Sequence, residues 1–405
     1  MFDIPLQVLS GQILIGLING SFYAVLSLGL AIIFGLLRVI NFAHGAQYML
    51  GAVTAWLLLH YAGIGFWLAL ILAPAIVGLV AAAIERLLLR QIYGIDHLYG
   101  LLLTFGLALI IEGAARYWLG VAGKPYAPPP ALQGAWNLGF VIIPIYRGFI
   151  VAISMAVCLT VWLLIEKTKF GSYLRAATEN ASLVASFGVN VPRLLTFAYV
   201  LGAALAAFAG VLAAPIYQVS PLMGSHLIII VFAVVVAGGM GSILGSVATG
   251  LAFGVIEGLT KVFYPQASSV SIFILMAAIL LVRPQGLFGR GGDAVAATTA
   301  LRPPKLAISR PWTIALPGLL VALLIVLPYL VYPPFILEML CLALFASAFN
   351  LLIGYAGLLS FGHAAFFGSA AYITGYVLKV WGMPPEIGIL AGMATSALLG
   401  AVIGV

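Results

Sequence analysis

Long apolar runs separated by short polar stretches dominate the chain, as in residues 12–37 and 66–89. A helix of about 20 apolar residues spans a bilayer, and a helix satisfies every backbone amide within its own segment. Runs such as residues 227–237 do not alternate apolar and polar positions, as the strands of a membrane barrel would. The pattern therefore predicts an all-α, polytopic bundle of transmembrane helices.

The apolar runs predict roughly 13 spans, since each approaches the length of a bilayer-crossing helix. They lie near residues 11–37, 42–62, 66–90, 97–119, 143–165, 194–216, 226–240, 243–263, 269–283, 312–331, 335–354, 362–381 and 386–405. The glycine-rich stretch 238–250 is compatible with two ordinary helix ends or with a broken, re-entrant pair.

Composition supports a membrane protein, because 64% of the 405 residues are hydrophobic and only 7% are charged, against about 25% charged in soluble domains. The net charge of +7 does not indicate nucleic-acid binding, since the basic residues cluster at the ends of apolar runs. Cys158 and Cys341 lie inside apolar runs without a CxxC or histidine neighbour, so no metal site is predicted. The N-terminal residues lack the positive region of a cleaved signal peptide.

Basic residues set the expected orientation, because positive charge collects on the cytoplasmic side. Arg86 and Arg90, the polar segment after the fifth run and residues 283–310 all fall on one side when the spans alternate. That side is predicted to be cytoplasmic, which places the N-terminus and residues 120–147 outside.

Residues 284–311 are rich in glycine, proline and small residues, which predicts a flexible cytoplasmic linker. The linker separates a transmembrane domain over residues 1–283 from a second one that begins at residue 312 and runs to 405. We expect the second domain to be the N-terminal part of a longer one.

An internal repeat connects the two domains. Phe34-Gly35 and residues 41–44 (Asn-Phe-Ala-His) recur as Ile353-Gly354 and residues 360–363 (Ser-Phe-Gly-His), and the offset in numbering is the same for every pair. In the predicted orientation, the apolar span before each copy runs from the outside to the cytoplasmic side. A pathway between two related halves is common among transporters, so the repeat favours a transport protein.

Residues 166–193 are too polar to span the membrane, and they predict a cytoplasmic helix that starts at Ser172 and stops at Gly188. Its small and apolar positions recur every three or four residues and share one face. The helix either docks in a groove of a partner protein, or it packs under its own domain or on the bilayer surface. The shared face comprises Leu174, Ala177, Ala181, Val184 and Gly188, whereas Arg175 and Glu179 point elsewhere.

Several stretches carry a family resemblance. Residues 16–45 (GLINGSFYAVLSLGLAIIFGLLRVINFAHG) strongly resemble the N-terminal signature of the LivH-type permease of branched-chain amino acid ABC importers. Residues 171–193 look like that family's coupling loop, and AGGMGSILGS at 237–246 and RPQGLF at 283–288 resemble its closing motifs. Residues 350–368 (NLLIGYAGLLSFGHAAFFG) resemble the LivM-type partner permease.

The resemblance implies a multi-pass subunit of the bacterial inner membrane without a cofactor, in which a LivH-like domain is fused to the start of a LivM-like one. It implies two partners, namely ABC ATPase subunits and a periplasmic substrate-binding protein, and a small amino acid-like solute. Permeases for urea and amides share these patterns, so the solute stays open. The positions that match the coupling loop, and so imply contact with the ATPase, are Leu174, Arg175, Ala177, Glu179, Ala181, Val184 and Gly188.

The sequence contains no GxxxxGK[S/T] loop for ATP phosphates, no paired carboxylate and histidine set at metal spacing and no GxSxG motif. The chain is therefore not predicted to be an enzyme, and its energy must come from a partner ATPase or from an ion gradient. The second case would make it an ion-coupled secondary transporter, which needs no docking helix.

Polar residues inside the spans are candidates for the translocation pathway. Glu112 and Glu257 each have a basic residue one turn on, Arg116 and Lys261, which favours structural ion pairs; Glu338 has none. If the signature lines the pathway, the candidates for solute contact are Asn19, Ser21, Tyr23, Asn41, His44 and His363, although a capping or packing role is favoured for the two histidines.

Overall fold

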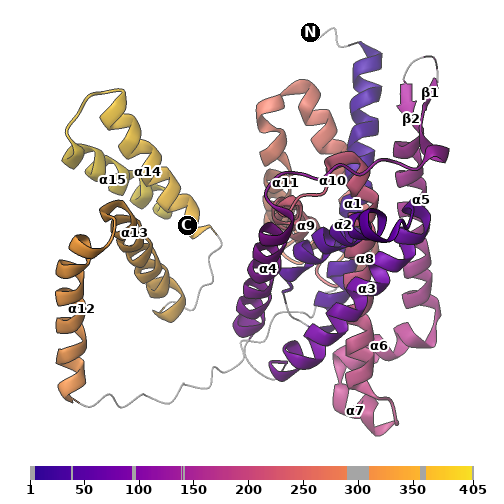
Figure 1. Cartoon of the computed structure of the whole chain (residues 1–405), viewed down its shortest axis with the longest axis horizontal. Helices are drawn as coiled ribbons and strands as arrows, with labels where there is room; N and C mark the ends of the chain where they lie inside the picture. The colour runs from indigo at the N-terminus through magenta and orange to yellow at the C-terminus, as the bar shows by residue number, and fades with distance from the viewer. Residues whose placement is uncertain are drawn as a thin grey trace. The chain divides into compact units, whose positions relative to one another are not determined.

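The computed structural model describes residues 5–37, 40–93, 97–137, 139, 142–289, 310–355 and 362–403. The chain forms two compact units, Met1–Leu301 and Arg302–Val405, and both are built from helices (Figure 1). Within the described residues nine helices are long and apolar enough to cross a membrane, and two further apolar segments are shorter. The predicted class, an all-α polytopic bundle, is confirmed.

Every long helix of the first unit lies within a few residues of a predicted span. These helices are α1 (Leu6–Leu37), α2 (Ala43–Ala62), α3 (Phe66–Leu87), α4 (His97–Leu119), α5 (Ile145–Lys167), α8 (Val191–Tyr217), α9 (Met223–Gly238), α10 (Ile243–Phe263) and α11 (Ser268–Val282). The shorter elements are α6 (Lys169–Glu179), α7 (Ala181–Ser186) and the 3-10 turns η1 (Leu89–Gln91), η2 (Pro130–Leu132) and η3 (Pro265–Ala267).

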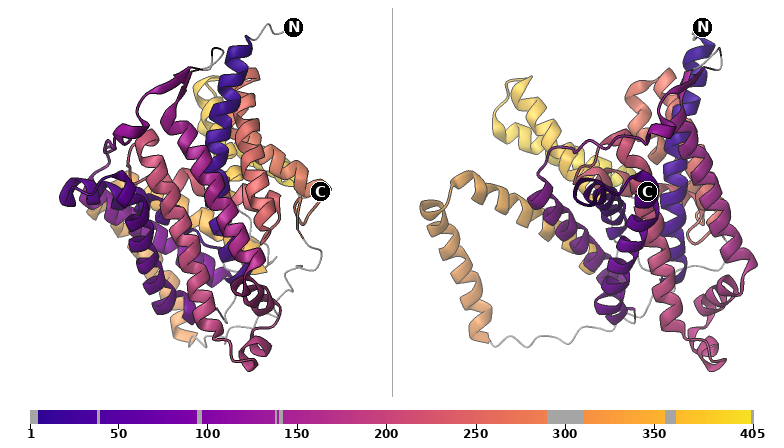
Figure 2. Two further views of the ribbon diagram at one scale, coloured as in Figure 1. Left: turned by 90° about the vertical axis from the view of Figure 1, so that its right-hand side faces the viewer. Right: turned by 45° about the vertical axis from the view of Figure 1, so that its right-hand side comes forward.

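The centre of the first unit is formed by α1 and α8. Their spanning segments are 83% and 72% buried, whereas that of α4 is only 17% buried. The two views of Figure 2 show α1 and α8 running side by side through the bundle. Helices with little buried surface expose their apolar side chains at the periphery, where lipid is their natural solvent.

Glycines allow α1 and α10 to approach at backbone contact. A Cβ atom built on Gly254 would lie 2.3 Å from the Cα of Gly20, and one on Gly16 would lie 2.5 Å from the carbonyl oxygen of Gly254. Small residues at such crossings are the usual way in which membrane helices pack closely. These glycines of α1 and α10 therefore serve helix packing.

The region between α9 and α10 is a tight connection of two ordinary helix ends. Gly239 and Gly241 adopt positive φ values of 102° and 83°, which a glycine adopts without strain. Ser242 then caps α10, because its Oγ accepts from the amide of Gly245 at 3.1 Å. Residues 239–242 thus connect two separate helices, and the re-entrant interpretation of residues 238–250 stays a prediction.

One element was not predicted, a small hairpin in the loop between α4 and α5. Strands β1 (Ala135–Asn137) and β2 (Ile142–Pro144) pair antiparallel with Trp136 opposite Ile143. The preceding loop is tied to the end of α8 by a backbone bridge between Lys124 and Val219. The hairpin lies at the same end of the bundle as the N-terminus (Figure 1).

The second unit contains α12 (Arg310–Leu330), α13 (Pro333–Asn350), a π-helical turn η4 (Leu351–Tyr355), α14 (His363–Lys379) and α15 (Pro385–Ile403). Its closest packing joins α14 to α15, where the Thr374 hydroxyl donates to the carbonyl of Gly388 at 3.0 Å. The predicted linker 284–311 lies largely outside the described residues. Its described start, residues 284–289, folds back, since the amides of Leu287 and Phe288 donate to the carbonyls of Ala237 and Gly238.

Candidate functional site

The polar segment between α5 and α8 lies at the opposite end of the first unit from the N-terminus and the hairpin (Figure 1). It forms two helices, α6 and α7, so the prediction of one helix over 172–188 is wrong. Asn180 separates them because it adopts an extended conformation, and its side chain accepts from the amide of Leu183. An asparagine that caps the second helix interrupts the first.

The predicted start of this segment is also wrong, whereas its stop is confirmed. α6 begins at Lys169, and Ser172 lies inside it with its hydroxyl 3.4 Å from the carbonyl of Thr168. Gly188 follows α7 with φ of +83°, the left-handed conformation that ends helices. Pro192 then stands in the first turn of α8.

The face predicted for docking is divided between the interior and the surface. Leu174, Ala177 and Val184 are buried in the core of the first unit, whereas Ala181 and Gly188 are exposed. These three buried residues hold the segment to the first unit, which agrees with the interpretation that the helix packs under its own domain. Those three side chains therefore cannot form an open surface for a partner.

The polar positions of the segment tie it to the end of α5. The Arg175 guanidinium donates to the carbonyl of Ile165 at 2.9 Å and lies 3.2 Å from a carboxylate oxygen of Glu166. Glu179, at the end of α6, is exposed. The segment is thus a small body attached to α5 at one end and to α8 at the other.

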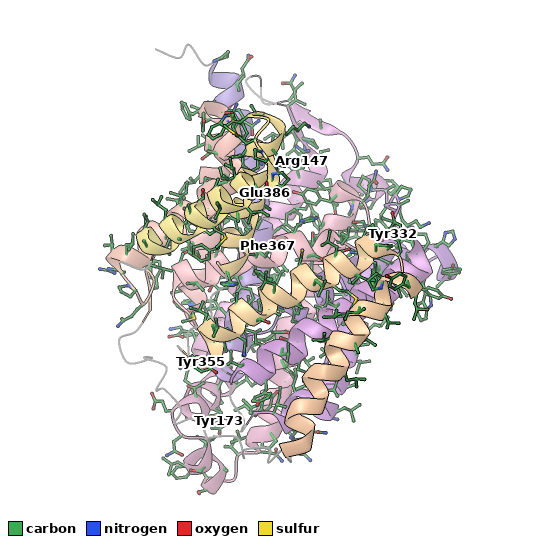
Figure 3. The ribbon with its side chains drawn as sticks, turned by 90° about the vertical axis from the view of Figure 1, so that its left-hand side faces the viewer. Arg147, Tyr173, Tyr332, Tyr355, Phe367 and Glu386 are labelled. Atoms are coloured by element: carbon green, nitrogen blue, oxygen red, sulfur yellow. The ribbon has the colours of Figure 1, made fainter. Side chains whose placement is uncertain are left out.

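The exposed surface of the segment carries apolar side chains that the face prediction omitted. Phe187 is 79% exposed and Leu183 is 54% exposed, and Tyr173 is also exposed. Figure 3 shows Tyr173 at the α6–α7 end of the bundle. Large apolar side chains on an otherwise polar projection are typical of a surface that a partner covers. The three residues do not share the helical spacing of the buried face, which is why the periodicity did not identify them.

Two of the predicted pathway residues belong to a polar cluster on α1, α8 and α10. The Tyr217 hydroxyl donates to the side-chain oxygen of Asn19 at 2.8 Å, and the Tyr23 hydroxyl donates to Glu257 at 2.8 Å. Glu257 also pairs with Lys261 at 2.6 Å, as predicted. The structure therefore brings together hydroxyl, amide, carboxylate and ammonium groups from three helices.

The other pathway candidates serve the packing of their helices. The Ser21 hydroxyl donates to the carbonyl of Leu17 within α1, and Asn41 accepts from the amide of Ala43 at the start of α2. His44 is fully buried, with its Nε2 atom 2.9 Å from the carbonyl oxygen of Leu26. His363 belongs to the second unit, where its ring lies 5.0 Å from that of Phe345 in a tilted arrangement. The described hydrogen bonds of Ser21, Asn41 and His44 do not involve the cluster around Glu257.

The remaining acidic residues within spans differ from one another. Glu112 pairs with Arg116 at 2.5 Å, as predicted, and also accepts from the Ser225 hydroxyl. Glu338, in α13, is exposed. These placements favour a structural role for Glu112.

Glu85, near the end of α3, is a buried acidic residue that the sequence reasoning did not single out. It accepts from the hydroxyls of Thr196 at 2.6 Å and Tyr93 at 3.0 Å. Burial and the neighbouring Glu85 carboxylate raise the pKa of Tyr93, which keeps its hydroxyl a donor. Glu85 stands beside Arg86 in the sequence, a pattern typical of a solvated helix end.

The apolar helices and the polar segment at one end of the bundle define a polytopic membrane protein. Over residues 12–282 and 334–405 the chain matches the family described as branched-chain amino acid transport system / permease component. The chain belongs to this family. It is therefore a translocation subunit of an ABC importer and a multi-pass protein of the bacterial inner membrane.

Individual relatives agree with the family. The high-affinity branched-chain amino acid transport system permease protein LivH of Escherichia coli is 29% identical over 296 residues, which cover 69% of this chain and 95% of LivH. The corresponding protein BraD of Pseudomonas aeruginosa is 32% identical over 294 residues with the same coverage. LivM of Salmonella typhimurium is 29% identical over 290 residues, which cover 65% of this chain and 67% of LivM.

Proposed function

We propose that the chain carries branched-chain amino acids across the membrane, driven by ATPase subunits that contact α6 and α7. The names of the LivH, BraD and LivM relatives support the solute. A periplasmic binding protein delivers the solute at the end of the bundle that carries the hairpin. The chain has no phosphate-binding loop of its own in its sequence, so ATP hydrolysis belongs to the partner.

One observation carries the proposal, namely an exposed apolar surface on a segment that is anchored on its other side. Phe187 and Leu183 face outward, while Leu174, Ala177 and Val184 are buried against the bundle. A partner that binds the outer surface and moves would therefore move the attached ends of α5 and α8. Such rigid-body coupling can exchange two access states of a pathway.

The contact is tested by Phe187→Glu, which places a charge on the exposed surface without disturbing the buried one. We expect normal membrane insertion, loss of ATPase co-purification and at least about tenfold slower uptake of radiolabelled leucine, since a central aromatic contact contributes about 2 kcal/mol or more. Ala177→Arg would be a poor test, because Ala177 is buried and the larger side chain would disrupt packing.

Phe288→Glu is the matched control, since Phe288 is also an exposed phenylalanine of the first unit and lies after α11, outside the segment. The control should retain the ATPase and transport at the wild-type rate. Wild-type uptake and co-purification in Phe187→Glu would refute the assignment of the contact to α6 and α7.

The polar cluster of Asn19, Tyr23, Tyr217, Glu257 and Lys261 is proposed to line the pathway. An amino acid carries one ammonium and one carboxylate, and the Glu257–Lys261 pair offers one group of each opposite charge. An ionisable pair inside a membrane span is costly unless it serves packing or function. The exposed side chains of the cluster, such as Tyr217, give the solute a point of access.

Glu257→Gln tests this part, with Glu112→Gln as its control, because both glutamates pair with a basic residue one turn on. Removal of a charged partner should raise the half-saturating solute concentration about tenfold, measured in proteoliposomes with binding protein and ATP. Equal changes in the two variants would show that Glu257 acts as an ordinary structural ion pair.

The two units are proposed to be a LivH-like domain over 1–283 and the start of a LivM-like domain over 312–405, joined by the linker 284–311. The repeat supports this division, because its constant offset in numbering relates the starts of helices as well as the sequence motif. The start of α3 at Phe66 and the start of α15 at Pro385 are separated by the same offset as His44 and His363. Expression of residues 1–289 tests the division: a domain that inserts and unfolds cooperatively is expected, and its failure to insert would contradict it.

A further inference from the structure

A polar pocket opens between the end of α3 and the start of α8, on the side of the bundle predicted to be cytoplasmic. Its volume is about 340 Å³, and it is lined by Arg86, Arg90, Asn190, Arg193 and Thr196. Three arginines thus line one space. Neither the pathway nor the ATPase contact described above uses any of these side chains.

The positive charge of the pocket has no partner among the described side chains. Within the described ranges the ion pairs join Glu112 to Arg116, Glu166 to Arg175 and Glu257 to Lys261, so none involves the three pocket arginines. The one carboxylate nearby, Glu85, accepts its hydrogen bonds from Tyr93 and Thr196. Three clustered guanidiniums repel one another, and a bound anion would relieve this repulsion.

The backbone adds to the attraction for an anion. Asn190 caps α8 by accepting from the amide of Arg193 at 3.1 Å, so the first turn of α8 borders the pocket. The amino-terminal end of a 27-residue helix carries partial positive charge. Guanidinium groups donate to phosphate oxygens in a forked geometry, which suits a phosphate more than a carboxylate.

The helices that border the pocket expose apolar side chains further along their spans. Phe197 lies one turn beyond Arg193 on α8, and Leu79 lies two turns before Arg86 on α3; both are more than half exposed. A ligand with a phosphate in the pocket could therefore extend hydrocarbon chains along these side chains. Free phosphate would leave that surface unused, whereas a lipid would cover both parts.

We propose that this pocket binds the phosphate of an anionic lipid headgroup in the cytoplasmic leaflet, with the acyl chains against α3 and α8. Basic pockets between helices on this side of a membrane are suited to such headgroups. The bound lipid would hold the cytoplasmic end of α3 to the start of α8. The start of α8 directly follows the α6–α7 segment in the chain. The inference depends on the predicted orientation and is independent of which solute is carried.

Native mass spectrometry of the detergent-solubilised full chain tests the proposal with three probes: phosphatidylglycerol, phosphatidylcholine and inorganic phosphate. The wild type should retain phosphatidylglycerol in preference to phosphatidylcholine. The triple variant Arg86→Gln, Arg90→Gln, Arg193→Gln should lose this preference, with about fivefold weaker binding for each guanidinium removed.

The control variant Lys167→Gln, Lys169→Gln, Arg283→Gln removes the same charge from the same side of the first unit and should bind like the wild type. If the triple variant does not insert, Arg90→Gln and Arg193→Gln alone should each show the fivefold loss. Three results would overturn the assignment. The wild type could retain both lipids equally, inorganic phosphate at equimolar concentration could displace phosphatidylglycerol, or the control variant could lose as much lipid binding as the triple variant. A triple variant that keeps its lipid but loses the ATPase would also overturn the assignment, since the arginines would then be a protein contact.

Discussion

The two units share a pattern of three helices, which opens the first unit and follows α12 in the second, yet they use it differently. The helices α1, α2 and α3 correspond to α13, α14 and α15 at the constant offset of the repeat. The spanning segment of α1 is 83% buried, whereas that of α13 with its π-helical turn is 6% buried. Similar sequences thus form similar helices, while the burial of those helices depends on what packs against them.

The histidine of each copy illustrates the difference. His44 is fully buried, with its Nε2 atom in contact with the carbonyl of Leu26. His363 is half-buried, and its ring lies 5.0 Å from that of Phe345, which occupies the position equivalent to Leu26 in the repeat. The contact recurs between the same two positions. In the first unit α8 and α10 also cover α1, and the described helices of the second unit include no counterpart of either.

The largest expected effect concerns the glycine contacts of the first unit. Gly254→Ala should destabilise the protein by about 3 kcal/mol or more, because the new methyl group would meet the backbone of Gly20. Gly375→Ala, in α14, should be neutral or stabilising by about 0.5 kcal/mol, since nothing lies within 4 Å of its Cβ position. Unfolding by SDS in mixed micelles measures the stability of both variants. Similar losses of stability in the two variants would contradict the comparison.

A smaller contrast is expected between the two histidines. His44→Ala should cost about 2–4 kcal/mol, because it leaves a cavity and a buried carbonyl without its partner. His363→Ala should cost about 1 kcal/mol or less, since its ring is partly exposed. The same unfolding titration separates them, and a larger loss for His363→Ala would show that the second unit has a tighter core than the structure indicates.

The smallest contrast compares two threonine hydroxyls. Thr196→Val removes a buried donor to Glu85 and should cost about 2 kcal/mol, whereas Thr374→Val removes a partly buried bond to Gly388 and should cost about 1 kcal/mol. Limited proteolysis reports them separately, since cleavage should increase in the first unit for one and in the second for the other. A shared cleavage pattern would mean that the two units unfold together.

Much of the fold follows from the sequence, because an apolar run long enough to span a membrane has few alternatives to a helix. The start of α10, for example, agrees with the predicted span at residue 243. The hairpin was missed because strands of three residues leave little pattern.

The candidate site was harder to predict, because periodicity identifies a face without saying what the face contacts. Leu174, Ala177 and Val184 share a face that the domain itself covers, and Asn180 breaks the segment that the pattern presented as continuous. The pocket arginines come from two segments that lie far apart in the sequence, such as Arg90 and Arg193, and only the fold brings them together.

The central claim, that the exposed side of α6 and α7 is held by an ATP-hydrolysing subunit, is tested most directly by photo-crosslinking. A photoreactive residue at position 187 in intact membranes should form an adduct with the ATPase, and the same residue at position 288 should not. Adducts with lipid alone from position 187, in membranes that contain the ATPase, would contradict the account.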